Sequence, residues 1–328
     1  MKKDLISIKD LSSQEINEVF SLTDKLKKSR DCPRRGLSLG FKNDFSKALK
    51  GKTLALIFQK PSNRTRVSFE VGMYQLGGNS IYLSPGEINL GVRESIKDAA
   101  KTLSRFIDAI VLRTFEHKDC LEMAKVSDAP VINGLSDFSH PCQALADLYT
   151  IKEKFSRPSG IPQKAGKSLK NITLAYVGDG NNVCNSLLFT CAKLGVNMNV
   201  GAPKGYEPEE TVLKYSQELA GKNGASIKLF NNAFDAVSGA DVIYTDVWVS
   251  MGQEEEANIR KEIFKDFQVN LDLVKSANKN ALIMHCLPAH RGEEITDDVI
   301  DSKNSIVFDQ AENRLHVEKA VLIKLLGS

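Results

Sequence analysis

Short apolar runs rich in valine, isoleucine and leucine alternate with longer amphipathic stretches along most of the chain. Short β-branched runs favour strands, and apolar positions three or four residues apart favour helices. The strands that this pattern predicts are 53–58, 80–83, 109–112, 172–177, 197–200, 242–245 and 282–284. The helices that it predicts are 64–76, 94–106, 141–154, 183–194 and 313–326. Val67, Val71 and Tyr74 share one face of the first helix. Such alternation builds parallel sheets covered by helices, so we predict an α/β fold.

The chain has 328 residues, which is enough for two domains, each with its own core. The segment 156–166 is rich in proline, glycine and lysine, so we predict a surface loop near a domain boundary there. We place the first domain at 1–150 and the second at 151–312, and expect the final helix, 313–328, to pack back on the first domain. Each domain should be a mainly parallel β-sheet flanked by helices. Such sheets bind ligands beyond the carboxyl ends of their strands, and we expect the active site in the interdomain cleft.

Composition excludes several classes of protein. Lysine and arginine number 44 against 41 acidic residues, so the net charge of +3 gives no general reason to expect nucleic acid or an anionic membrane as partner. Six scattered cysteines without a C-x-x-C pair argue against a zinc ribbon or a disulfide scaffold. The sequence shows neither the apolar core of a secretory signal nor a membrane span. We therefore predict a cytoplasmic protein with reduced thiols.

The first half contains a candidate anion site. The string S-N-R-T-R at 62–66 follows a predicted strand and opens a helix, so backbone N–H groups, a capping serine and two guanidinium groups can converge on a phosphate. Arg113 ends a later strand, and H-P-C-Q at 140–143 starts the next helix; its histidine and amide suit an uncharged group such as a carbamoyl. Taken singly, each motif is commonly structural. All three fall at strand ends of one predicted sheet, so we expect one site.

The second half repeats the strand-loop-helix pattern with different chemistry. G-D-G-N-N at 178–182 lacks the G-x-G-x-x-G spacing, and the next strand ends without an acidic residue, which argues against dinucleotide binding. Asn182 offers an amide for the carboxylate or ammonium of an amino acid, although a turn asparagine would look the same. Asp246 ends another strand and can pair with a substrate ammonium, or simply cap the strand end. Ser250 lies close behind it.

The string H-C-L-P-A-H-R-G at 285–292 follows the last predicted strand. A metal site of His285, Cys286 and His290 is disfavoured, because a tight turn with proline lacks the helical spacing of two ligands. A nucleophilic cysteine is also disfavoured, since the sequence names no acid–base partner for it. Arg314, in the string E-N-R, adds a cation at the start of the final helix. We predict no metal and no organic cofactor.

Together these strings resemble the aspartate/ornithine carbamoyltransferase superfamily, and within it the ornithine carbamoyltransferases, over about Leu5 to Leu326. The S-M-G and H-C-L-P strings are the most specific signals. The resemblance implies transfer of a carbamoyl group from carbamoyl phosphate to the side-chain amine of L-ornithine, which gives citrulline and phosphate. It also implies a homotrimer whose active sites are shared across subunits. The sequence does not decide between arginine biosynthesis and arginine breakdown.

The resemblance also implies roles for individual residues. The carbamoyl phosphate contacts that it implies, in the first domain and the H-C-L-P turn, are Ser62, Asn63, Arg64, Thr65, Arg113, His140, Gln143, Cys286, Leu287 and Arg314. The ornithine contacts that it implies are Asn182, Asp246, Ser250 and Met251. The residues expected to act in catalysis are Arg113, His140, Asp246 and Cys286.

Three features depart from the family's pattern. Asn63 stands where threonine, methionine or leucine is common, which leaves the backbone donors and the arginines in place. Asn89 stands in the loop 84–91, where many members place a histidine or glutamine that reaches a neighbouring subunit's carbamoyl phosphate. The segment Arg30 to Phe45 is longer than usual.

The alternative functions are a carbamoyltransferase for acetylornithine or putrescine, and a noncatalytic homologue that only binds.

Overall fold

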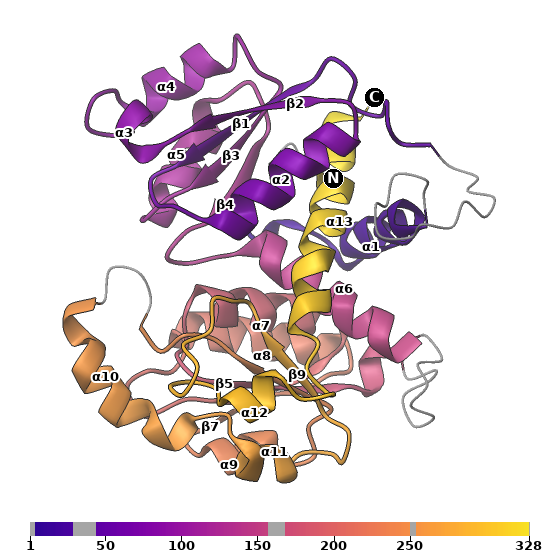
Figure 1. Cartoon of the computed structure of the whole chain (residues 1–328), viewed down its shortest axis with the longest axis vertical. Coiled ribbons are helices and arrows are strands. Elements are labelled where there is room, and N and C mark those ends of the chain that lie inside the picture. Colours follow the sequence, from indigo (N-terminus) through magenta and orange to yellow (C-terminus); the bar gives the residue numbers. More distant parts are fainter. Residues whose placement is uncertain (1–3, 29–43, 157–167, 250–253, 328) are drawn as a thin grey trace. The chain divides into compact units, whose positions relative to one another are not determined.

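The computed structural model describes residues 4–28, 44–156, 168–249 and 254–327 (Figure 1). The chain divides into two compact units, unit 1 with Met1–Ala146 and Glu312–Ser328, and unit 2 with Asp147–Ala311. Nearly all of the predicted loop 156–166 and of the segment Arg30 to Phe45 lies outside the described residues. Within the described ranges, no helix is both long and apolar enough to cross a membrane.

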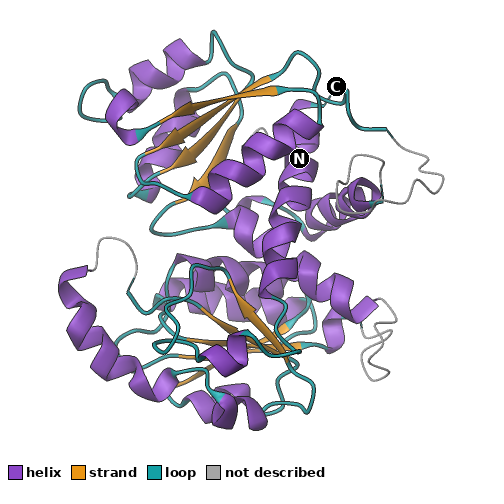
Figure 2. Cartoon of the chain, viewed as in Figure 1, coloured by secondary structure: helices purple, strands orange, loops and turns teal. Residues whose placement is uncertain are grey.

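Unit 1 is built on a parallel sheet with the strand order β2-β1-β3-β4. The strands are drawn in orange in Figure 2. Its strands are β1 (Thr53–Phe58), β2 (Asn79–Leu83), β3 (Ala109–Arg113) and β4 (Val131–Leu135). Its helices are η1 (Ile8–Asp10), α1 (Ser13–Lys27), α2 (Asn63–Gln75), α3 (Pro85–Ile88), α4 (Ile96–Leu103) and α5 (His117–Val126). One hydrophobic core packs the central strands, through residues such as Ile57 and Ile110, against Ala99 of α4 and Met123 of α5.

Unit 2 is built on a second parallel sheet with the strand order β7-β6-β5-β8-β9. Its strands are β5 (Thr173–Val177), β6 (Asn197–Gly201), β7 (Ile227–Phe230), β8 (Val242–Thr245) and β9 (Leu282–His285). Its helices are η2 (Leu169–Asn171), α7 (Asn182–Leu194), α8 (Glu210–Lys222), α9 (Ala233–Val237), η3 (Glu254–Glu256), α10 (Ala257–Phe264), η4 (Lys265–Phe267), α11 (Leu271–Lys275) and α12 (Asp297–Ile300). Trp248 and Phe264 stack at 5.9 Å between ring centroids in its core.

Two helices contain residues of both units. Helix α6 (Pro141–Ser156) begins in unit 1 and ends in unit 2, and α13 (Val307–Leu326) begins in unit 2 and ends in unit 1. The alternation of strands and helices therefore confirms the predicted α/β fold of two parallel sheets flanked by helices. Each predicted strand forms within one residue of its predicted ends.

The helices differ from the predicted pattern in three places. The helix predicted at 94–106 forms only as α4, Ile96–Leu103. The face of α2 that carries Val67, Val71 and Tyr74 is exposed, and its buried side is formed by Phe69 and Met73. Helix α13 begins six residues before the predicted start at 313, because the mostly polar segment 309–313 is part of the helix.

Each sheet has a point where the connections leave in opposite directions. In unit 1, β1 has β2 on one side and β3 on the other, and in unit 2, β5 has β6 on one side and β8 on the other. The loops at such a point diverge beyond the carboxyl ends of the strands, and this is where open α/β sheets bind ligands. The S-N-R-T-R and G-D-G-N-N strings follow β1 and β5, the central strands of these points.

Gly180, in the loop after β5, has no room for a side chain. A Cβ atom there would lie 2.2 Å from the backbone nitrogen of Pro208 and 2.4 Å from the carbonyl carbon of Glu207. We expect Gly180→Ala to displace this loop and to lower the free energy of unfolding by about 1–3 kcal/mol, as overpacking usually does. The matched control is Gly221→Ala, in α8, where no atom lies within 4 Å. This change should stabilise the chain slightly. Equal thermal unfolding midpoints for the two variants would contradict the close packing.

Candidate active site

The loop after β1 presents a helix start at the carboxyl edge of the first sheet. The Ser62 hydroxyl caps α2 by accepting a hydrogen bond from the backbone N–H of Thr65 at 3.4 Å. The backbone N–H groups of a first helical turn favour a bound anion. Thr65 is buried, Arg64 is half-buried, and the side chain of Asn63 is exposed. The predicted phosphate loop is therefore formed as a helix start.

His140 lies between β4 and α6 and is buried, and four cations act on its charge state. Burial is the main reason that the pKa of His140 lies well below its ordinary value, and the charges of Arg314, Arg113, Lys60 and Arg64 lower it further. The imidazole is consequently neutral at physiological pH, with one nitrogen that donates and one that accepts. Residues from four separate segments thus meet within unit 1.

Arg314 connects the first turn of α2 with the first turn of α6. Its Nη1 donates to Oε1 of Gln143 at 2.6 Å, and its Nη2 donates to Oγ1 of Thr65 at 3.3 Å. Arginine has no acceptor, so the side-chain amide of Gln143 must face it with the carbonyl oxygen. Both partners come from the set that the sequence indicated for carbamoyl phosphate.

Two residues of this region differ from the sequence-based prediction: one was expected at the anion site and lies elsewhere, and the other was not expected there. The second arginine of the loop, Arg66, does not join the cluster: it pairs with Glu70 at 3.0 Å, and its guanidinium stacks on the ring of Tyr82 at 3.8 Å. Lys60 was missed, although it is buried and is one of the cations that act on His140. Its position just after a strand of the same sheet was the available signal.

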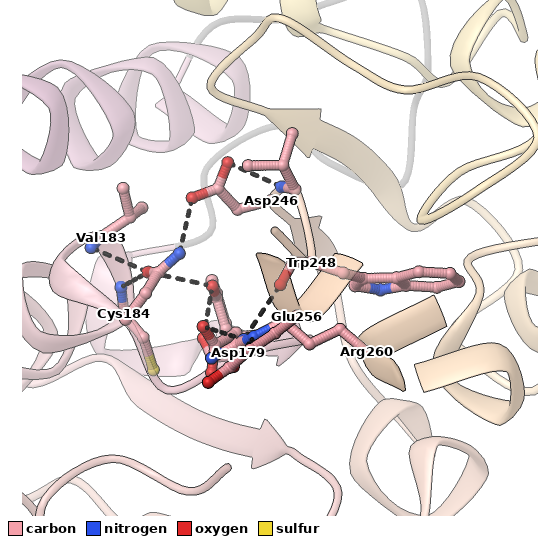
Figure 3. Close-up of polar contacts among 10 residues, drawn as sticks. Asp179, Val183, Cys184, Asp246, Trp248, Glu256 and Arg260 are labelled. Carbon is pink, nitrogen blue, oxygen red and sulfur yellow. Dashed lines mark hydrogen bonds and ion pairs between the residues drawn. The ribbon is translucent and has the colours of Figure 1, made fainter. Parts of the chain in front are cut away.

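In unit 2, a buried carboxylate lies at the corresponding edge of the sheet. Asp246 follows β8, and its Oδ2 accepts a hydrogen bond from Nδ2 of Asn181 at 2.8 Å (Figure 3). The other end of the Asn181 amide caps α7, because Oδ1 accepts from the backbone N–H groups of Val183 and Cys184 at 2.9 and 3.1 Å. Asn181 was not among the residues predicted from the sequence, although an asparagine before a helix is a common cap.

Two further donors hold the Asp246 carboxylate. The thiol of Cys286, after β9, donates to Oδ1 at 2.9 Å, and the backbone N–H of Val247 donates to the same oxygen at 2.8 Å. Groups that follow β5, β8 and β9 therefore converge on one carboxylate. Cys286 is only partly buried.

The turn after β9 is held by His285. Its Nδ1 accepts from the backbone N–H of Leu287 at 2.8 Å, and its Nε2 lies 3.0 Å from Oε1 of Glu294. The proton of the neutral ring is consequently on Nε2, which donates to the carboxylate. Leu287 adopts a left-handed φ of 58° and precedes a cis peptide bond to Pro288. A non-glycine residue in this conformation is uncommon and is often found at functional sites.

The donor atoms of Asp246, His285 and Cys286 lie within 4.8 Å of one another, as those of a metal site would. Both ring nitrogens of His285 already have partners, however, so the imidazole would have to give up a hydrogen bond to bind a metal. His290 groups instead with Glu293 and Glu294. The first cluster is therefore better explained as a hydrogen-bonded carboxylate than as a metal centre.

An ion pair that the sequence did not predict holds two loops of unit 2 together. Nη1 of Arg260, on α10, donates to Oδ2 of Asp179 at 3.0 Å and to the backbone carbonyl of Trp248 at 3.0 Å (Figure 3). Nε of Arg260 also donates to Glu256 at 3.1 Å. Arg260 thus connects the loop after β5 with the segment after β8. Its position in a strongly charged stretch gave no signal that its side chain turns inward.

The remaining candidate residues are less fully defined. Ser250 and Met251 lie outside the described residues. Asn182 is half-buried and begins α7. Asn89 is exposed and ends α3 with a φ of 41°.

Comparisons with known proteins agree with this organisation. The family model "Aspartate/ornithine carbamoyltransferase, carbamoyl-P binding domain" matches residues 3–153, and the model "Aspartate/ornithine carbamoyltransferase, Asp/Orn binding domain" matches residues 170–325. The chain belongs to the aspartate/ornithine carbamoyltransferase family.

Individual members of the family are similar over nearly the whole chain. The ornithine carbamoyltransferase of Thermococcus kodakarensis is 50% identical over 327 residues, which cover 99% of this chain and 96% of that protein. The crystal structure of ornithine carbamoyltransferase from Thermus thermophilus has a TM-score of 0.84 at 39% identity and covers 99% of both chains. The structure of ornithine carbamoyltransferase from Pyrococcus furiosus has a TM-score of 0.88 at 50% identity and covers 97% of this chain and 95% of that one.

The buried pair of Asp179 and Arg260 predicts a pH dependence of stability. The pKa of Asp179 is raised from 3.8 to about 6, mainly by burial, although Arg260 lowers it. Between about pH 4 and pH 6 the folded chain therefore binds more protons than the unfolded chain, so this group makes the free energy of unfolding fall as the pH rises.

Asp179→Asn should remove this dependence. We expect the unfolding free energy of the wild type, relative to that of the variant, to fall by up to about 3 kcal/mol from pH 4 to pH 7. Urea unfolding of both proteins across this range measures the difference. Parallel pH profiles would show that Asp179 does not titrate as its burial requires.

Proposed function

We propose that this member of the family is an ornithine carbamoyltransferase, which transfers the carbamoyl group of carbamoyl phosphate to the side-chain amine of L-ornithine. The observation that carries the proposal is the hydrogen bonding of Arg314 to Thr65 and Gln143 in unit 1. The neutral His140 is buried in the same unit, and the charges of Arg64, Arg113 and Arg314 act on its pKa. The names of relatives about 50% identical over nearly the whole chain support the same activity.

We assign the phosphate group of carbamoyl phosphate to the start of α2. Ser62, Asn63 and Thr65 lie at this N-terminal end of the helix, which favours an anion, and Arg64 supplies a positive charge. This arrangement suits a dianion both in the substrate and as the leaving group.

The carbamoyl group is assigned to the neighbouring donors. Attack by an amine turns its carbonyl oxygen into an oxyanion, which Thr65, Arg113 and His140 would stabilise by hydrogen bonds. Gln143, Leu287 and Arg314 would hold the rest of the carbamoyl group. A neutral imidazole among cations is suited to hydrogen bonding, whereas a charged one would add to their repulsion.

The second substrate is assigned to unit 2. Ornithine's side-chain amine has a solution pKa of about 10.4, as for lysine, and must lose a proton before it can attack. Asp246 and Cys286 would position this amine, while Asn182, Ser250 and Met251 would hold the amino-acid end. A nitrogen–carbon bond then forms, the carbon–oxygen bond to phosphate breaks, and the departing phosphate takes the electron pair and the amine's proton.

Other properties implied by the family remain predictions. These include an active site in the interdomain cleft, cytoplasmic localisation, and a homotrimer in which Asn89 reaches a neighbouring subunit. The exposure of Asn89 is compatible with such a contact. Light scattering should give three times the chain mass; a fully active monomer would exclude shared active sites.

Substrate choice is tested by incubating the protein with carbamoyl phosphate and, in turn, ornithine, acetylornithine, putrescine and aspartate. Ornithine should give the highest kcat/KM, with citrulline as product. A preference for acetylornithine or putrescine would instead favour one of the alternative carbamoyltransferases. No product from any of these amines would favour the noncatalytic alternative.

Arg64→Ala should lower kcat/KM with carbamoyl phosphate by about 10²- to 10³-fold, as loss of a charge-stabilising donor commonly does. The matched control is Arg66→Ala, two residues further along the same helix, whose side chain pairs with Glu70 instead. It should change kcat/KM by no more than a few-fold. If both variants lose activity equally, or neither does, the assignment of the phosphate loop is wrong.

A further inference from the structure

Beside the proposed carbamoyl phosphate site lies a buried carboxylate to which the mechanism gives no role. Glu318 lies on α13, one helical turn after Arg314, and the exposed fractions of the two side chains are 0% and 4%. Oε1 of Glu318 accepts from Nε of Arg314 at 2.8 Å and lies 2.6 Å from Nη2. One edge of the guanidinium is therefore held by this carboxylate.

The rest of the same guanidinium faces the site. Nη1 donates to Gln143, and Nη2 donates to Thr65. A guanidinium is a rigid planar fork, so fixing one edge fixes the direction of its other N–H groups. The position of Glu318 therefore determines where Arg314 can meet Gln143 and Thr65.

Helix stability does not account for this pair. An arginine four residues before a glutamate is the less favourable order on a helix, because each charge then faces the unfavourable end of the helix dipole. Burial also raises the pKa of Glu318 against the opposing effect of Arg314, which shows that the carboxylate is costly to keep there. A buried ion pair is often no more stable than apolar residues of the same size.

We propose that Glu318 is a positioning residue for carbamoyl phosphate, which acts by orienting Arg314 toward Gln143 and Thr65. The inference rests on the proposed function of this site. On this proposal, Glu318 does not contact the anion but affects its affinity through the orientation of Arg314.

The sign of the effect separates positioning from simple electrostatics. Removing a negative charge beside a cationic site should by itself strengthen the binding of an anion. If Glu318 instead orients Arg314, its removal should weaken binding, because a misplaced donor loses most of its contribution.

The test is Glu318→Gln, which keeps the size of the side chain and removes its charge. Inorganic phosphate is titrated into the wild type and the variant by calorimetry, and the KM values for both substrates are measured. We expect phosphate binding about tenfold weaker and a similar rise in KM for carbamoyl phosphate, with the KM for ornithine nearly unchanged. Equal or tighter phosphate binding would overturn the proposal.

Glu70→Gln is the matched control. Glu70 also follows its arginine, Arg66, by four residues on a helix of unit 1, but this pair is partly exposed. The change should leave phosphate binding as it is. Should Glu318→Gln fail to fold, Glu318→Asp tests the same position, since it withdraws the carboxylate by one methylene. It should also weaken phosphate binding.

A double-mutant cycle with Arg314→Lys tests whether Glu318 acts through Arg314. In that background Glu318→Gln should have no further effect on phosphate affinity, because lysine lacks the planar fork. The same tenfold loss there would overturn the proposal.

Phosphate binding without citrulline formation by the wild type would contradict the proposed function alone, whereas a wild type that binds no phosphate would contradict both.

Discussion

The repulsion among the cations that act on one buried imidazole is the constraint on which the proposed anion site of unit 1 depends. Arg64, Arg113, Arg314 and Lys60 all act on His140, and a group of like charges with little water costs free energy unless an anion balances it. Burial keeps the imidazole neutral, which limits the total charge. Glu318 neutralises part of the remainder from behind Arg314. A site with this balance is suited to a substrate that arrives with two negative charges.

In unit 2, the carboxyl edge of the sheet carries a negative charge, whereas the same edge in unit 1 carries positive charges. The loops after β5, β8 and β9 converge on the Asp246 carboxylate, which accepts from Asn181, Val247 and Cys286. These donors fix the direction of the carboxylate, so an amine can meet it with little further ordering. Each sheet thus presents charged side chains beyond the carboxyl ends of its strands, arginines in unit 1 and a carboxylate in unit 2.

The sequence predicted much of the fold because buried parallel strands are short apolar runs that few other elements resemble. It missed β4, whose Asn133 and Gly134 have the composition of a turn, and the four-residue β7, which includes Lys228. It assigned no burial to Arg260 or Glu318, because each lies in a charged helix where solvent exposure is the usual outcome. Long-range partners decide such cases: Arg260 turns inward to Asp179, 81 positions away in the chain.

The candidate anion site was predictable for a related reason. Arg64, Arg113 and His140 lie at or after the ends of strands of one parallel sheet, so the order of the strands brings them to one edge even though they are far apart in sequence. Arg314 comes from α13 instead. Arg66 was misjudged because the sequence could not show that its helical neighbour Glu70 and the ring of Tyr82 would hold it elsewhere.

The proposed anion site can be tested by a crystal structure with phosphonoacetamide, in which a methylene group replaces the labile bridging oxygen of carbamoyl phosphate. We expect the phosphonate at the start of α2 beside Arg64, with the carbonyl oxygen directed at Arg113 and His140. An analogue bound away from these side chains would contradict it.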